Sequence, residues 1–131
     1  MDELPIQSGD DVVRVRQFVR NAAADNGLSL VDQTKLVTAA SELARNTLVH
    51  GHGGAARVEV VKSANGRVGI KLYFTDEGPG IPDIGLALTD GWTTGTGLGL
   101  GLSGARRLVD EFELTSKPGA GTSVVLVKWS R

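Results

Sequence analysis

The sequence contains no cysteine, which excludes a disulfide framework and a thiolate metal site. It has little net charge, −1 at pH 7, and its basic residues are scattered, so the composition favours binding neither to nucleic acid nor to a membrane. The opening residues MDELPIQSGDD are acidic and lack an apolar run. We therefore expect neither a signal peptide nor a membrane anchor, and we expect a cytoplasmic location. With 131 residues and no repeat or linker, the chain is predicted to form one domain over residues 1–131.

Lysine is missing from the long stretch between Lys71 and Lys117, which excludes the GxxxxGK[ST] pattern of a phosphate-binding P-loop. Gly99, Gly101 and Gly104 do fit the pattern GxGxxG. That dinucleotide fingerprint directly follows a strand, however, whereas DGWTTGT precedes it here. A Rossmann-type site is therefore disfavoured.

Glycine is the residue in excess, with 18 of 131 positions, about twice its usual share of roughly 7%. Nine of these glycines lie between Asp76 and Gly104, five of them in TGTGLGLGLSG, residues 94–104. A glycine inside a helix or strand weakens it by roughly 0.5–1 kcal/mol relative to alanine. Another requirement must outweigh this loss: either the backbone approaches a ligand closely, or the segment is a mobile loop.

Hydrophobic periodicity predicts alternating helices and strands along the chain. Helices are expected over residues 10–27, 29–51 and 102–112, with a short one over 82–90; strands are expected over 3–7, 56–63, 67–76, 113–117 and 122–130. Ser29 is expected to cap the second helix, and Asn65-Gly66 to form a hairpin turn. Trp129 alternates with Val125 and Val127, which favours a place in the core. The fold class predicted is α+β, a two-layer α/β sandwich with a mixed, mostly antiparallel sheet and three helices on one face.

Three polar side chains are candidates for a functional site. Glu42 and Asn46 lie one helical turn apart on the flank of an apolar helix face, where they form either one wall of a cleft or a solvated pair. Asp76 continues the face of Val68, Ile70, Leu72 and Phe74, so its carboxylate points toward the core layer and needs a partner. Alternatively, Asp76 only caps the glycine- and proline-rich loop that follows it.

Taken together, these motifs resemble the N, G1 and G2 boxes of the GHKL ATPase superfamily, which includes gyrase and the histidine kinases. The matching motifs, in order, are Glu42-x-x-x-Asn46, Asp76-x-Gly78-x-Gly80 and Gly95-x-Gly97-x-Gly99-x-Gly101. Gly119-Ala-Gly121-Thr122 is similar to the closing Gly-x-Gly-Thr of that superfamily. The resemblance implies the Bergerat ATP-binding fold.

The resemblance also implies ATP and Mg²⁺ as cofactors and a role for each motif residue. Asn46 would ligate Mg²⁺, Asp76 would accept a hydrogen bond from the adenine amino group, and Thr122 would support Asp76. Glu42 would orient or deprotonate the attacking hydroxyl as the catalytic residue. The other ATP-binding residues expected are Gly78, Gly80, Gly95, Gly97, Gly99 and Gly101, because amides of a glycine loop that leads into a helix bind phosphates well.

Within the superfamily, the chain is most similar to the anti-sigma factor serine kinases and, among them, to the RsbT-type switch kinases. The segments that carry this likeness are SELARN, DEGPGIPDI, DGWTTGTGLGLGL and ARRLVDEFEL. It implies a serine/threonine kinase that phosphorylates a STAS-domain antagonist in a bacterial partner-switching, stress-signalling (stressosome) pathway and then activates a PP2C-type phosphatase. The segment LVHGHGG is more similar to the anti-sigma branch, so an anti-sigma factor that sequesters a sigma subunit is one alternative. A non-catalytic, ATP-gated binding module is another.

Overall fold

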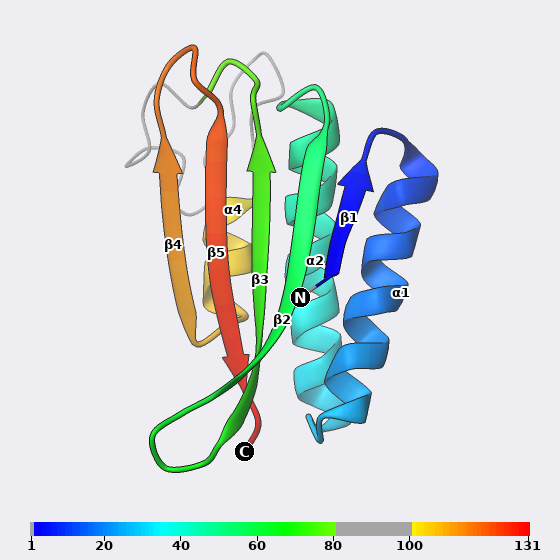
Figure 1. The fold of residues 1–131 in the computed structure, drawn as a ribbon, viewed down its shortest axis with the longest axis vertical. Coiled ribbons are helices and arrows are strands. Elements are labelled where there is room, and N and C mark those ends of the chain that lie inside the picture. Colours follow the sequence, from blue (N-terminus) through cyan, green and yellow to red (C-terminus); the bar gives the residue numbers. More distant parts are fainter. Residues whose placement is uncertain (1, 81–100) are drawn as a thin grey trace.

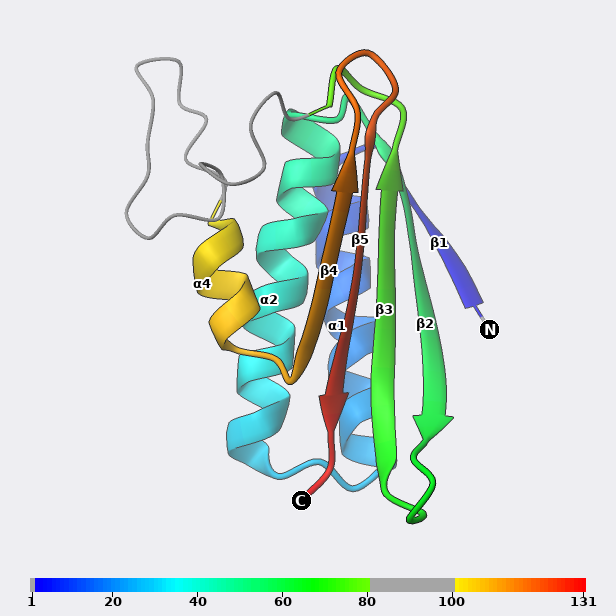
Figure 2. The ribbon, with the colours of Figure 1, turned by 90° about the vertical axis from the view of Figure 1, so that its left-hand side faces the viewer.

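The computed structural model describes residues 2–80 and 101–131 and arranges them in two layers. One layer is a five-stranded sheet in the order β1-β2-β3-β5-β4, and all four pairings are antiparallel. The helices of the described segments lie together on one face of this sheet (Figures 1 and 2). The elements are β1 (Asp2–Ile6), α1 (Gly9–Asp25), α2 (Leu30–Val49), β2 (Gly54–Lys62), β3 (Val68–Asp76), α4 (Leu102–Arg107), β4 (Glu111–Ser116) and β5 (Thr122–Trp129). The α+β sandwich is confirmed, with antiparallel pairing throughout the described strands.

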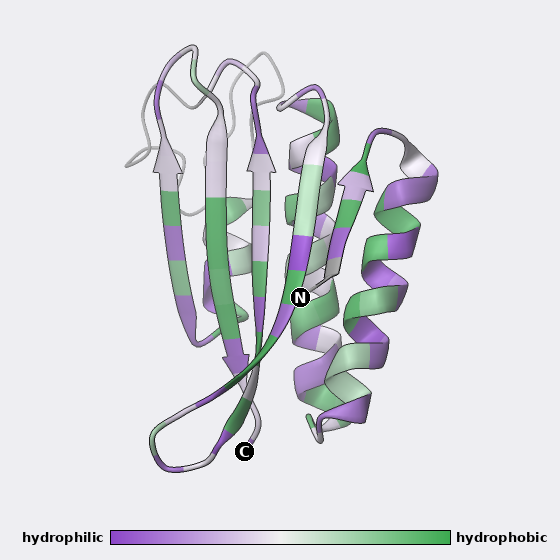
Figure 3. Ribbon diagram, in the orientation of Figure 1, coloured by the Kyte–Doolittle hydropathy of each residue, from purple (hydrophilic) through white to green (hydrophobic). Residues whose placement is uncertain are grey.

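The core lies between the sheet and α2. Ile70, Leu72 and Phe74 alternate along β3 and are almost fully buried on the face toward the helices. Their partners on β5 include Leu126, opposite Leu72. Leu43 of α2 belongs to the same buried cluster. Figure 3 shows that β5 is hydrophobic along most of its length and near neutral where it begins. The sheet is thus fixed by apolar packing in its middle, and its ends are left for polar groups.

Local signals in the sequence set several element boundaries. The Ser29 hydroxyl accepts a hydrogen bond from the Asp32 N–H at 3.1 Å and caps α2, as expected. β1 is an edge strand that pairs with β2. The predicted hairpin turn joins β2 to β3, and Gly66 adopts a positive φ of 84° there. The cap and the turn are confirmed, and each depends on neighbouring residues alone, whereas the place of β1 at the edge of the sheet is set by its pairing with β2.

Two expectations for the C-terminal third are wrong. The third helix was expected to reach residue 112, but α4 ends at Arg107 and β4 begins at Glu111. In β4 the exposed glutamates alternate with the half-buried Phe112 and Leu114, which is the period of a strand. Trp129 was expected in the core. Its neighbour Lys128, however, is buried on the face toward the helices, where it pairs with Asp32 of α2, and successive strand residues point to opposite faces.

Trp129 therefore belongs to the opposite face of the sheet. Its ring lies over Gly69, where an added Cβ would come within 2.6 Å of Cε3, and its indole N–H donates to Glu111 Oε2 at 2.8 Å. The expected helix over 82–90 and the three glycines Gly95, Gly97 and Gly99 lie outside the described residues. Among the helices of the described segments, none is long and apolar enough to cross a membrane.

Candidate functional site

Three loops meet around Asp76 at one end of the sheet. They are the α2–β2 loop with Gly51, the loop that follows β3 with Gly78, and the β4–β5 turn with Gly121. A Cβ on Gly51 would lie 2.5 Å from Asp76 Oδ2, and a Cβ on Gly78 would lie 2.7 Å from Gly51 Cα. A Cβ on Gly121, whose φ is +87°, would collide with the Asp76 backbone oxygen. Glycine is needed at these three positions because Asp76 and the neighbouring loop backbones come too close to leave room for a Cβ atom.

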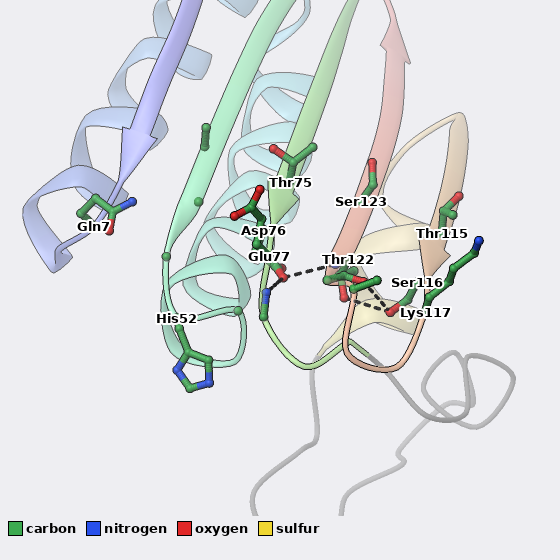
Figure 4. Close-up of a pocket in the computed structure, with 17 residues that line it drawn as sticks. Gln7, His52, Thr75, Asp76, Glu77, Thr115, Ser116, Lys117, Thr122 and Ser123 are labelled. Atoms are coloured by element: carbon green, nitrogen blue, oxygen red, sulfur yellow. Dashed lines mark hydrogen bonds between the residues drawn. The ribbon is translucent and has the colours of Figure 1, made fainter.

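The Asp76 carboxylate is held by one of its two oxygens. Oδ1 accepts from the Gly78 N–H at 2.9 Å and from the Thr122 N–H at 3.2 Å (Figure 4). In the described part of the chain, no hydrogen bond and no ion pair is made to Oδ2. Two backbone donors therefore fix the orientation of the carboxylate, and its second oxygen is available as an acceptor.

Thr122 is itself positioned by a residue that the sequence analysis missed. The Ser116 hydroxyl lies 3.1 Å from Thr122 Oγ1 and donates to the Gly121 backbone oxygen at 3.1 Å (Figure 4). Ser116 and Thr122 are partners across the β4–β5 turn. The signal was present in the sequence, because a tight turn centred on Gly119 places residues 116 and 122 opposite each other.

A cavity of about 740 Å³ opens beside Asp76. It is lined by the three loops together with side chains that include Gln7, His52 and Lys117 (Figure 4). Asp76, Gly78 and Thr122 are thus gathered at one place. Gly80, with a positive φ of 78°, lies against the backbone oxygen of Lys117. Neither Glu42 nor Asn46 lines this cavity.

Glu42 belongs to a second opening, of about 610 Å³, which Gly101 and Arg107 also line. A Cβ on Gly101 would lie 2.7 Å from Glu42 Oε2, so the last glycine of the G2 motif is brought directly to the proposed catalytic residue. The Glu42 side chain is 39% exposed, and its other oxygen, Oε1, lies 3.7 Å from Arg45. The structure therefore leaves this carboxylate accessible from solvent.

Asn46 lies between these two regions. It follows Glu42 by one turn of α2, about 6 Å along the helix axis. Its backbone oxygen accepts from the N–H groups of His50 and Gly51 where the helix ends. The chain thus passes from Asn46 to Gly51, which contacts Asp76, within a little more than one further turn. α2 and its C-terminal loop connect the proposed metal ligand to the proposed adenine acceptor.

The chain is similar to known proteins over most of its length. The chain is 46% identical over 121 residues to the serine/threonine-protein kinase RsbT of Bacillus subtilis (strain 168), covering 92% of this chain and 90% of that protein. It is 30% identical over 117 residues to the anti-sigma F factor of Thermoanaerobacter sp. (strain X514), covering 87% of this chain and 82% of that one.

Solved structures show the same fold. The structure of the RsbU and RsbW domains of a Mycobacterium tuberculosis protein matches all of this chain at TM-score 0.60 and 22% identity, and the chain spans 33% of it. The catalytic domain of the histidine kinase ThkA matches 99% of this chain and 97% of its own at TM-score 0.52 and 15% identity. Residues 31–130 match the model of the histidine kinase-, DNA gyrase B- and HSP90-like ATPases. The chain belongs to that ATPase family.

Proposed function

We propose that this protein is an ATP-dependent serine/threonine protein kinase of the RsbT type. The observation that carries the proposal is the 46% identity, over 92% of the chain, to a relative named as such a kinase. The structure supports it by bringing Glu42 to Gly101 and by leaving Glu42 accessible. The kinase would act in the cytoplasm, where ATP is available.

The adenine end of the nucleotide is assigned to Asp76. Its Oδ1 is occupied by two backbone N–H groups, whereas Oδ2 is available to accept from the adenine amino group. Because Gly78 and Thr122 fix the carboxylate in place, it needs no reorganisation when the nucleotide binds. Gly80 would lie with Gly78 in the loop beside the base. Gly95, Gly97, Gly99 and Gly101 would supply amides to the phosphates.

The metal assignment rests on the side-chain oxygen of Asn46. Mg²⁺ prefers oxygen ligands, and it commonly keeps several waters while it binds through one or two protein side chains together with substrate phosphates. The Asn46 side-chain oxygen would be that ligand. When bound, Mg²⁺ would neutralise charge on the phosphates.

Glu42 is assigned to the transfer step. Its carboxylate would accept the proton of a serine or threonine hydroxyl on the substrate protein. The hydroxyl oxygen forms a bond to the γ-phosphorus as the bond between that phosphorus and the β–γ bridging oxygen breaks. The products are a phosphoester and ADP, with the proton on Glu42. A general base of this kind contributes typically 10²–10⁴ in rate.

The substrate proposed is a STAS-domain antagonist protein, and the second partner is a PP2C-type phosphatase that the kinase activates after it releases the antagonist. Direct binding of a sigma subunit is the second candidate function, favoured by the likeness to anti-sigma F factors. An assay that mixes the chain with a sigma subunit or with a STAS-domain protein, each with and without ATP, separates the two. If the chain retains the sigma subunit and not the STAS-domain protein, the result would favour the anti-sigma function.

Glu42→Gln tests the kinase proposal. We expect ATP affinity to stay near that of the parent, because Glu42 acts after the nucleotide has bound. We expect transfer from γ-labelled ATP to a STAS-domain protein to fall by about two orders of magnitude or more. Glu113→Gln, an exposed glutamate on β4, is the matched control and should transfer at the parent rate. A Glu42→Gln protein with the parent's rate would rule out the general base, and a parent that binds ATP without transfer would indicate a binding module.

A further inference from the structure

A groove of about 210 Å³ runs between α1 and α2 on their solvent side. Its walls carry Arg16 and Arg20 from α1 and Arg45 from α2, with Thr38 and Ser41 between them. All three arginines are exposed. Arg16 and Arg20 form no ion pair within residues 2–80 and 101–131, so their charges are not neutralised by the rest of the described chain.

The charge of the groove is strongly one-sided. Glu42 is the one carboxylate among the described residues that line it, against three arginines. Glu42 lies 3.7 Å from Arg45, an exposed pair that contributes little. The chain as a whole has a net charge of −1, so this local excess of positive charge is not a reflection of its composition. A ligand that fits the groove is therefore anionic.

Apolar side chains extend both helix faces beyond the arginines. Val13 lies one helical turn before Arg16 on α1, and Val49 lies one turn after Arg45 on α2. Val13 is 57% exposed and Val49 is 56% exposed. Each offers apolar surface beside the charged groove that a bound protein segment, unlike a small ion, would cover.

The groove also reaches the proposed site of transfer. Thr38 and Glu42 line both this groove and the opening that contains Gly101. From Thr34 to Arg45 the groove follows α2 for about 16 Å, at 1.5 Å per residue. An extended peptide covers that length with about five residues, at roughly 3.3 Å each. A segment lying there would bring a neighbouring hydroxyl to Glu42.

We propose that this groove is the docking site for an acidic segment, about five residues long, that flanks the acceptor serine or threonine of the protein substrate. Carboxylates of the segment pair with Arg16, Arg20 and Arg45, and Val13 and Val49 contact apolar residues next to it. The proposal deepens the proposed kinase function and rests on it. It assigns substrate recognition to α1 and α2, apart from the residues that bind the nucleotide.

The first test uses a probe that does not depend on catalysis. The full chain labelled with ¹⁵N is titrated with a pentaglutamate peptide, and amide shifts are followed by NMR. We expect shifts concentrated at residues 16, 20, 38, 41 and 45, weakened by added salt and absent with pentalysine. Shifts of equal size at Arg57 and Lys71 on the outer sheet face, or no shifts at all, would overturn the proposal.

The second test uses charge-reversed variants in the transfer assay. In Arg16→Glu/Arg20→Glu we expect the KM for the STAS-domain protein to rise about tenfold or more, with kcat within twofold and ATP affinity unchanged. Lys35→Glu, on an exposed face of α2 outside the groove, is the matched control and should keep the parent KM. Arg16→Ala/Arg20→Ala gives the same comparison without reversed charge, should the first variant fold poorly.

The outcomes separate the two proposals. A parent that shows no transfer contradicts the kinase function, while the peptide titration still decides whether the groove binds acidic segments. A parent that phosphorylates its substrate while both double variants keep its KM contradicts the docking site alone.

Discussion

Asp76 and Asp32 lie at opposite ends of the fold, and their carboxylates have opposite environments. Asp76, where β3 ends, is held by two backbone N–H groups on one oxygen and has no cationic partner within the described chain. Asp32, in the first turn of α2, is 6% exposed and pairs with Lys128 at 3.5 Å. One carboxylate is left available, and the other is neutralised inside the protein.

The neutralised end is a network that ties the C-terminus to the core. Lys128 is 3% exposed, and its Nζ lies 3.9 Å from Asp110 as well as near Asp32. Arg131 donates to Asp110 at 2.9 Å and lies 3.7 Å from Asp32. The backbone N–H of Trp129 donates to Asp110 Oδ2 at 2.7 Å. No buried side-chain nitrogen or oxygen of the described residues lacks a hydrogen-bond partner.

The difference separates a carboxylate that is neutralised within the protein from one whose second oxygen stays available. Asp32 is buried and Asp76 is half-buried, and a carboxylate removed from water is unfavourable unless a cation or hydrogen-bond donors satisfy it. At Asp32 these partners are side chains of the protein itself. At Asp76 they are loop amides, which satisfy one oxygen and leave free the oxygen that we propose binds the nucleotide. Substitutions at the two ends should therefore separate stability from binding.

The largest effect is expected from Lys128→Met. It keeps the length and apolar stem of the side chain but leaves Asp32 and Asp110 without their buried cation. Breaking a buried ion pair in this way typically lowers the free energy of unfolding by about 3–5 kcal/mol. Urea denaturation monitored by circular dichroism measures the loss. Lys62→Met, on an exposed position of β2, is the control and should change stability by less than about 0.5 kcal/mol.

Asp76→Asn should have the next largest effect, on binding instead of stability. The asparagine oxygen can still accept from Gly78 and Thr122, but an NH₂ group replaces Oδ2 and would face the adenine amino group. We expect ATP and ADP affinity to fall by about a hundredfold, since a hydrogen bond to a charged group contributes about 1.5–3 kcal/mol. Calorimetric titration measures it. Unchanged affinity would show that Asp76 does not bind the nucleotide. Asp76 and Asp32 would then no longer differ in being used by a ligand.

A smaller and more selective effect is expected from Asn46→Ala. The change removes the side-chain oxygen proposed to hold Mg²⁺ and adds no charge beside the phosphates. We expect affinity for ATP to fall about tenfold in the presence of Mg²⁺ and to change less when EDTA removes the metal. Titrations in the two buffers make the comparison. Equal losses in both would contradict the assignment of Asn46 as the metal ligand.

The smallest effect is expected from Arg131→Gln. Arg131 contacts the same two carboxylates as Lys128, but its side chain is 59% exposed. Exposed ion pairs contribute about 0–1 kcal/mol, so stability should fall by less than about 1 kcal/mol. Urea denaturation of Arg131→Gln and Lys128→Met side by side shows whether the loss of stability depends on how deeply the cation is buried. A loss as large as that of Lys128→Met would mean that the network acts as one unit.

Much of the fold could be predicted from local pattern, and some of the site could too. Ser29, the Asn65-Gly66 turn and the alternation of Ile70, Leu72 and Phe74 depend on contacts within a few residues. Asp76 and Gly78 were predicted from their spacing, and the structure brings them together. The end of α4 could not be found, because Asp110 and Glu111 join a strand whose partner, Val127, lies far along the chain. The role of Ser116 needed the register of that same pairing.

The sequence by itself determined the alternation of helices and strands, which follows from the 3.6- and 2-residue periods of side chains. It also determined the caps and turns, which depend on a few neighbouring residues. The tertiary structure alone decided which face of β5 is buried, so that Trp129 lies outside the core and Lys128 inside it. It also decided that Arg16 and Arg20 face Arg45 across a groove, and that Asp32 meets Lys128. Such pairings join residues far apart in the chain, and their energies depend on burial and distance, which exist only once the layers have packed.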